Sequence, residues 1–168
     1  MMLRWNAVLV SVFVFVSWLR GGEPLYVPHG ADAIGTAFAV TASPGHWNCF
    51  HNQALMTDVT SSGVSASLVN RFMIPALSSK AVSAVIVMKP TPFGLVASHY
   101  GNADYCRIFT GLGSAVRIAK TVSLGVQIDY ISERSISEYR DLSHVTFEAG
   151  MTCLISKSLT LGLHIFNP

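Results

Sequence analysis

Charge is scarce in this chain. Asp, Glu, Lys and Arg make up 12% of its 168 residues, whereas 51% are hydrophobic, an apolar composition for a soluble protein of one-domain size. The net charge is only +2 and no basic run occurs, which argues against a nucleic-acid partner. Cysteine is scarce too: Cys49, Cys106 and Cys153 are odd in number and widely spaced, which excludes a disulfide framework.

The chain also lacks the run of about 20 apolar residues that a membrane-spanning helix requires. Its N-terminal apolar stretch, from Ala7 to Leu19, is shorter, with Arg4 before it and Arg20 after it. A short apolar run behind a basic residue is typical of a secretory signal peptide. We therefore predict that residues 1–22 form a signal helix that directs export, with an uncleaved anchor or a buried helix as the alternative.

What the chain does have is strict alternation. In "TVSLGVQIDY" (121–130) the apolar residues Val122, Leu124, Val126, Ile128 and Tyr130 alternate with small or polar ones. This pattern predicts a β-strand with one apolar and one polar face. Similar patterns predict further strands at 64–73, 80–100, 105–118, 142–154 and 158–166.

A repeated unit connects these strands. Lys80, Lys120 and Lys157 each begin a "Lys-x-Val/Leu-Ser/Thr" motif that opens an alternating strand after a short turn. If these turns share one end of the sheet, 80–100 must be one long strand, kinked at Pro90 and Pro92. We therefore expect six antiparallel strands joined as up-and-down hairpins, with short turns at one end and the longer loop 132–141 at the other.

The apolar faces of the strands could meet either of two environments, a protein core or lipid. A soluble β-sandwich would bury them, whereas a membrane barrel would turn them towards lipid. The predicted export, the nine- to eleven-residue apolar faces and the unequal loop lengths favour an all-β, antiparallel transmembrane β-barrel. The polar faces would then line a lumen, and the residues expected there are Arg107, Arg117, Gln127, Asp129, His144, Glu148 and His164. Six strands are too few to close such a barrel, so we expect it to be incomplete: either the chain is truncated or partner strands come from elsewhere.

Several loose motifs follow one another in a fixed order along the chain. They are Gly30-Ala31 with Gly35, Ala37-Phe38-Ala39, Trp47 with Phe50-His51-Asn52-Gln53-Ala54 and Met56, Phe93-Gly94, Tyr105 with Arg107, Leu124-Gly125 with Asp129-Tyr130, Phe147-Glu148-Ala149-Gly150, and Phe166-Asn167-Pro168. In this series the chain resembles the PorV/PorQ-type outer-membrane proteins, relatives of the FadL-like fatty-acid transporter barrels. It departs from them at Asp32, where the family usually has Arg, and at Leu55-Met56, which replaces Gly-Leu.

The resemblance implies a domain plan and a function. Residues 23–60 would form a hatch-like segment whose motif comprises Gly30, Gly35, Trp47, Asn52 and Gln53, and residues 61–168 would form barrel hairpins. The expected location is the outer membrane of a Gram-negative bacterium, in contact with lipid. The protein would pass or bind an apolar small molecule, or would support type IX secretion through secretion-system partners. The alternative is a soluble exported β-sandwich binding module. We expect neither an enzyme nor a cofactor.

Two patterns leave a choice between function and structure. His46, Cys49 and His51 cluster as metal ligands can, but no second ligand pair accompanies them, so we favour a structural role. Several glycines share the polar faces of the strands. They either allow curvature and lumen packing, which we favour, or permit close approach of the hatch; they are Gly111, Gly113, Gly125, Gly150 and Gly162.

Overall fold

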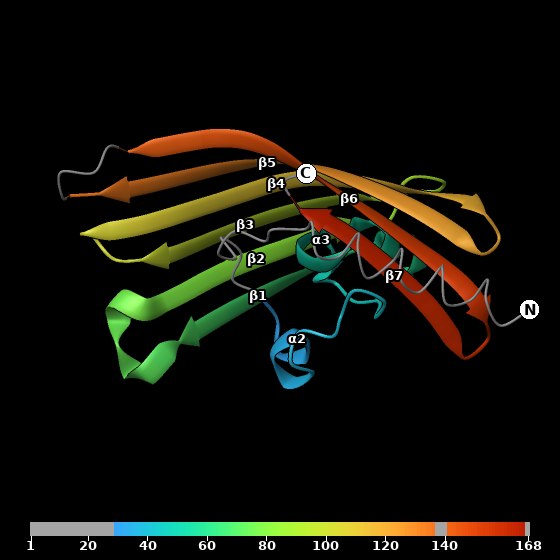
Figure 1. The fold of residues 1–168 in the computed structure, drawn as a ribbon, viewed down its shortest axis with the longest axis horizontal. Helices are drawn as coiled ribbons and strands as arrows, with labels where there is room; N and C mark the ends of the chain where they lie inside the picture. The colour runs from blue at the N-terminus through green and yellow to red at the C-terminus, as the bar shows by residue number, and fades with distance from the viewer. Residues whose placement is uncertain (1–28, 137–140, 167–168) are drawn as a thin grey trace, which may run out of the picture.

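A single antiparallel sheet, curled into a half-barrel, dominates the computed structural model (Figure 1). The structure describes residues 29–136 and 141–166, so the expected signal peptide 1–22 lies outside the described part. The sheet comprises β1 (Gly63–Asn70), β2 (Ser78–Ile86), β3 (Phe93–Gly101), β4 (Tyr105–Ala119), β5 (Val122–Ser135), β6 (Leu142–Ser156) and β7 (Leu159–Phe166). Each strand pairs with its neighbour in sequence, which confirms the up-and-down antiparallel arrangement. Within the described residues the sheet is open, with β1 and β7 at its edges.

The expected count of six strands is wrong, because 80–100 forms two strands rather than one. The chain turns between Ile86 and Phe93, which pair with each other at the ends of β2 and β3. Pro90 and Pro92 lie in this turn, where the missing N–H of proline removes no hydrogen bond from the sheet. The extra reversal places Lys80 at the opposite end of the sheet from Lys120 and Lys157. The three lysine turns therefore do not share one end.

The burial pattern of the sheet is the reverse of that in a soluble protein, because many polar side chains are buried and the apolar face is exposed. On β5 the side chains of Ser123, Gln127 and Asp129 are buried, whereas Val126 and Ile128 are 63% and 65% exposed. The alternation thus separates a polar, covered concave face from an apolar, uncovered convex face. The register carries this division across the sheet, because Gln127 lies opposite Gly113 on β4 and Glu148 on β6.

The concave face is covered by residues 29–59, which we call the plug segment. It contains α2 (Ala31–Gly35), α3 (Asn48–His51) and the 3-10 helix η1 (Gln53–Asp58), and η1 packs against β4, β5 and β6 (Figure 1). Two further 3-10 turns, η2 (Arg71–Met73) and η3 (Pro75–Leu77), connect β1 to β2. None of the helices in the described ranges is long and apolar enough to cross a membrane.

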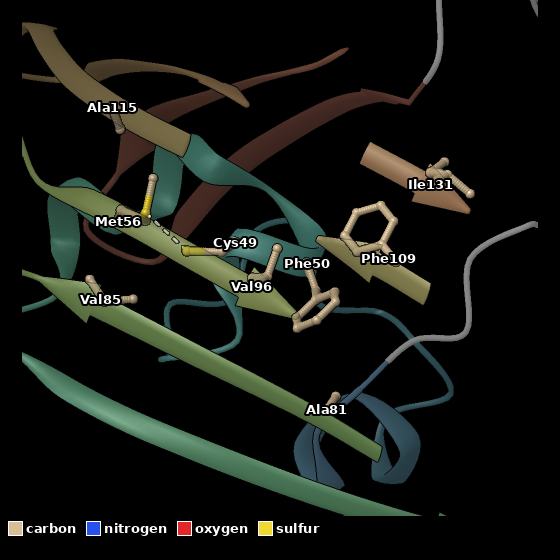
Figure 2. Close-up of a cluster of buried hydrophobic side chains, with 9 residues drawn as sticks. All are labelled: Cys49, Phe50, Met56, Ala81, Val85, Val96, Phe109, Ala115 and Ile131. Carbon is tan, nitrogen blue, oxygen red and sulfur yellow. Dashed lines mark hydrogen bonds between the residues drawn. The ribbon is translucent and has the colours of Figure 1, made fainter. Parts of the chain in front are cut away.

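A small apolar core joins the plug segment to the sheet (Figure 2). Cys49, Phe50 and Met56 of the plug segment lie against side chains of β2 to β5, among them Val96 and Phe109. The Phe50 and Phe109 rings are 5.8 Å apart between centroids. Aromatic rings at this separation pack favourably beyond the area they bury. Polar contacts of the plug segment, made by Asn52 and Gln53, lie beside this core.

Several glycines of the sheet allow close approach of the plug segment, among them Gly125 and Gly150. A Cβ atom at Gly125 would overlap the backbone of Gln53 and Ala54, and one at Gly150 would overlap the side-chain oxygen of Asn52. These glycines therefore allow close contact with the plug segment, which corrects our interpretation of them as room for curvature. Gly35, by contrast, has nothing within 4 Å of its Cβ position.

We expect Gly125→Ala to destabilise the protein and Gly35→Ala to leave it as stable or more so. The added methyl at residue 125 must displace the backbone of η1, and overpacking of this kind costs about 1–3 kcal/mol. At Gly35, inside α2, alanine meets open space and improves helix propensity by about 0.5–1 kcal/mol. Urea unfolding of both variants measures the difference. Equal effects would contradict the close approach of η1 to β5.

Candidate functional site

The candidate site is the contact between the plug segment and the polar concave face, and Asn52 fastens one side of it. The Asn52 amide nitrogen donates to the Thr41 carbonyl at 2.7 Å and to the Met151 carbonyl on β6 at 3.3 Å. Its side-chain oxygen accepts the Ala54 N–H at 3.1 Å, which caps the start of η1. One fully buried amide therefore connects two parts of the plug segment to the sheet.

Gln53 reaches the sheet through a buried carboxylate. Its Nε2 donates to the Cys49 carbonyl at 3.2 Å and to Oε2 of Glu148. The same oxygen of Glu148 receives His164 Nε2 from β7 at 2.9 Å. Glu148 has no exposed surface, so water does not compete with these two hydrogen bonds. This carboxylate thus joins η1, β6 and β7.

Gln127 and Asp129 extend the polar contact onto β5. The Gln127 Nε2 donates to Asp129 Oδ1 at 2.8 Å, and both side chains lie over Gly111. Gln127 is 1% exposed and Asp129 is fully buried. The absence of a side chain at Gly111 creates the space that these two groups occupy, because a Cβ there would overlap Asp129 Oδ1.

Ion pairs lie at the two ends of the concave face. Arg117, near the end of β4, pairs with Asp58 of η1 and also donates to the Thr57 carbonyl at 3.2 Å. Beside it lies a pocket of about 200 Å³, lined mostly by hydroxyl and charged side chains from η1, from the turn at Lys120 and from the nearby ends of β4 to β7. At the other end, Arg107 Nε lies 2.6 Å from Glu133 Oε1. Both guanidinium groups therefore have carboxylate partners.

The seven residues expected in the lumen all lie on the concave side of the sheet, but in three different settings. The structure brings four of them together beneath the plug segment, namely Gln127, Asp129, Glu148 and His164. Arg107 and Arg117 lie apart from this group in their ion pairs. His144 shares the face of Glu148 by alternation but is exposed, beyond the reach of the plug segment.

Of the hatch motif, Gly35 alone makes no close contact. Gly30 precedes α2 with a φ of 103°, a conformation that favours glycine, and its Cβ position is blocked by Asp32 and Trp47. Trp47 packs on Phe50 at 5.8 Å between ring centroids.

Sequence reasoning missed Asp58 and Glu133, the partners of Arg117 and Arg107. The alternation of β5 places Glu133 on the polar face, so that residue at least was detectable from the pattern.

The cluster of His46, Cys49 and His51 does not form a metal centre. Cys49 Sγ donates to Met56 Sδ at 3.2 Å, His51 Nε2 bonds the His29 carbonyl at 2.9 Å, and His46 lies 3.3 Å from the Ser61 carbonyl. Across the described residues, no three or more His, Cys, Asp or Glu side chains converge as metal ligands. Burial raises the pKa of the Cys49 thiol to about 12, so this cysteine stays protonated and unreactive.

Two histidines of the plug segment are held neutral. Burial, together with the nearby His51 ring, lowers the pKa of His29 from 6.5 to about 4. Burial also lowers the pKa of His51. His29 packs edge-on against Phe50, with ring centroids 4.8 Å apart. Protonation of these rings therefore opposes docking of the plug segment.

Comparison of the chain with protein-family models, with curated proteins and with solved structures finds no match. The arrangement itself holds a folded segment against a sheet through buried side-chain amides and carboxylates. It combines the apolar core of Figure 2 with a polar, hydrogen-bonded docking surface beside it.

We expect Asn52→Leu to loosen the plug segment and Asn70→Leu to have little effect. The first change leaves the Ala54 N–H and two carbonyls buried without their partner, at a cost of about 2–5 kcal/mol. Asn70 is exposed at the end of β1 and serves as the matched control. Urea unfolding gives the stability, and limited proteolysis within 36–45 reports release of the segment. Resistance to protease equal to that of wild type would contradict the anchoring role.

We expect the unfolding free energy to fall as the pH falls from 6.5 towards 4, and His29→Phe to reduce this fall. In that window the unfolded chain binds a proton at residue 29 that the folded chain does not bind, because the folded pKa is about 4. The contribution of His29 is about 3 kcal/mol. Urea unfolding at several pH values measures it, with Val96→Ala as a core variant that should lower stability without changing the slope. An unchanged slope in His29→Phe would refute the assignment.

Proposed function

We propose that this chain forms part of the wall of an outer-membrane β-barrel similar to the PorV/PorQ and FadL-like proteins. The plug segment would lie on the lumen side. The barrel would pass or bind apolar small molecules, or would support protein secretion. The observation that carries the proposal is the inverted sheet, because polar groups such as Gln127 and Glu148 are buried while Val126 and Ile128 are exposed. Water on the convex face would make this arrangement unfavourable, whereas lipid makes it favourable.

The extent of the convex apolar face supports a lipid environment. From Val122 to Tyr130 the outward residues of β5 are all apolar, a length of about 27 Å along the strand. A membrane barrel carries an apolar band about 25 Å tall. The band continues across neighbouring strands through exposed apolar side chains, among them Val64, Val82, Leu95, Leu112, Phe147, Leu163 and Ile165.

The charges on the convex side support the same environment by their position. On the described strands, Lys80 and Arg134 are the charged outward residues, and both lie near the end of the sheet where β1, β3 and β5 finish. Lys89, Lys120 and Lys157 lie in the turns at the other end. Cations therefore flank the apolar band on both sides, as at the two surfaces of a bilayer.

The soluble β-sandwich remains the alternative. A sandwich packs the apolar faces of two sheets together, with the polar faces outside. Here the plug segment covers the polar face, and residues 29–136 and 141–166 place no second layer over the apolar one. Recovery of the protein in the soluble periplasmic fraction would favour the sandwich. Between the two membrane functions, capture of secretion components favours the secretion role, and loss of ligand uptake on deletion favours transport.

We expect Val126→Arg to destabilise the membrane-inserted protein strongly and Ser132→Arg to destabilise it weakly. Val126 lies at the centre of the apolar band, where Arg facing lipid costs about 2–4 kcal/mol, and this cost falls to about 0–1 kcal/mol near the interface. Ser132 lies on the same face of β5, in the row of Lys80. Unfolding in phospholipid vesicles measures both costs. Equally small costs, with the variants soluble without detergent, would refute the lipid environment.

A further inference from the structure

Two hollows lie next to each other on the convex face of the sheet. The larger, of about 680 Å³, is lined by residues of β1 to β4, among them Lys80, Ala97 and His99. The smaller, of about 310 Å³, is lined by residues of β3 to β6, among them Leu95, Ala97 and Leu112. Both include Ala97, so the two hollows meet at this residue. We call the two together the outer groove.

The outer groove follows from a row of small side chains that runs across the strands. The register places the members of this row side by side on β1 to β4, and they are Ala66, Val82, Ala97 and Thr110. The row towards the centre of the apolar band is bulkier, with Leu95 beside Leu112. The row on the other side is also bulkier and contains Leu68 and Ile108. The small row therefore lies lower than the rows that flank it.

Two basic side chains stand at one end of the outer groove. Lys80 and His99 are directly opposite each other on β2 and β3, so their Cβ atoms are about 4.5–5.5 Å apart. The ion pairs of residues 29–136 and 141–166 do not include Lys80. The nearest turn contains Asp104, which accepts a hydrogen bond from Asn102 at 3.2 Å. The outward positions of the described strands hold no Asp or Glu, so this cation has no carboxylate partner on its face.

The outer groove leads from these basic groups into the apolar band. From His99 to Leu95 the strand advances four residues, which is about 13 Å. The lining of both hollows is almost entirely apolar along this path. A depression with a cation at one end and apolar walls beyond it is complementary to an anionic head group that carries a hydrocarbon chain.

We propose that the outer groove binds one anionic phospholipid, with its phosphate at Lys80 and His99 and an acyl chain over Ala97. An ammonium and an imidazole N–H both donate to phosphate oxygens. In the low row the chain contacts side chains on both flanks, which increases its van der Waals contacts over those on a flat surface. This inference rests on the proposed lipid environment of the convex face, and it adds a preference for one class of lipid at one place.

Lipid binding to the full 168-residue chain in detergent micelles tests this inference. Native mass spectrometry should show one phosphatidylglycerol retained per chain, and about fivefold less phosphatidylcholine at the same concentration. Lys80→Gln should weaken retention of phosphatidylglycerol about fivefold, the contribution of one lysine at an anionic surface. Ala97→Leu fills the outer groove while keeping both basic groups, and it should weaken retention about tenfold.

Two outward residues outside the outer groove provide matched controls. Arg134 is paired with Asp141 at 3.9 Å, and Arg134→Gln removes the same charge as Lys80→Gln. Ala149 lies opposite Val126 on the convex face, and Ala149→Leu adds the same bulk as Ala97→Leu. Both controls should retain phosphatidylglycerol as wild type does. All four variants should insert into phosphatidylcholine vesicles with the wild-type urea midpoint, which separates lost binding from misfolding.

Three results would overturn the inference. One is insertion of wild type into vesicles with equal retention of the two lipids, and another is equal loss in Arg134→Gln and Lys80→Gln; both leave the proposed function intact. Displacement of the lipid by excess glycerol phosphate, which has no acyl chain, would indicate a phosphate site alone. Protein that stays soluble without detergent would instead overturn the proposed function together with this inference.

Discussion

The buried hydrogen bond between Gln53 and Glu148 is the contact on which the rest of the structure depends. A sheet with Ser, Gln, Asp and Glu on its inner face cannot be covered by an apolar layer, because each polar group would lose water without gaining a partner. The plug segment solves this by presenting amides to the sheet, and Gln53 and Asn52 are fully buried there. With the polar face satisfied in this way, the apolar residues are left on the convex side.

The register of the strands determines both faces of the sheet at once, the inner contacts and the residues displayed outside. Slipping β5 by one residue would place Val126 beneath η1 and turn Gln127 outwards. The same slip would bring a side chain to the position of Gly125, where the backbone of the plug segment now lies. The close approach at this glycine and the hydrogen bonds of Glu148 therefore select the same register. The inner contacts thus determine which residues the outer surface displays.

Local sequence patterns were sufficient to predict most strands, but they could not predict the long-range contacts. The alternation of 121–130 predicted the first part of β5 and the polar side chains that share its face, whereas the strand continues to Ser135, into the stretch 132–141 that was expected to be a loop. Pro90 and Pro92 were misinterpreted because a kink and a turn have the same local sequence, and the pairing of Ile86 with Phe93 decides between them. The bond from Gln53 to Glu148 spans 95 residues, and neither spacing nor composition indicates it. The glycines were ambiguous for the same reason, since a missing side chain does not reveal what fills its space.

A polar plug contact has a different energetic character from an apolar one. Separating apolar surfaces in water exposes them at about 25 cal/mol per Å², whereas polar groups released into a wet lumen recover hydrogen bonds with water. The plug contact combines both kinds, because the core around Phe50 and Phe109 lies beside the hydrogen bonds of Asn52 and Gln53. The polar part of the contact can therefore be released at a lower cost than the apolar part. The buried carboxyl group of Glu148 on β6 thus ties docking of the plug segment to its hydrogen bond with Gln53.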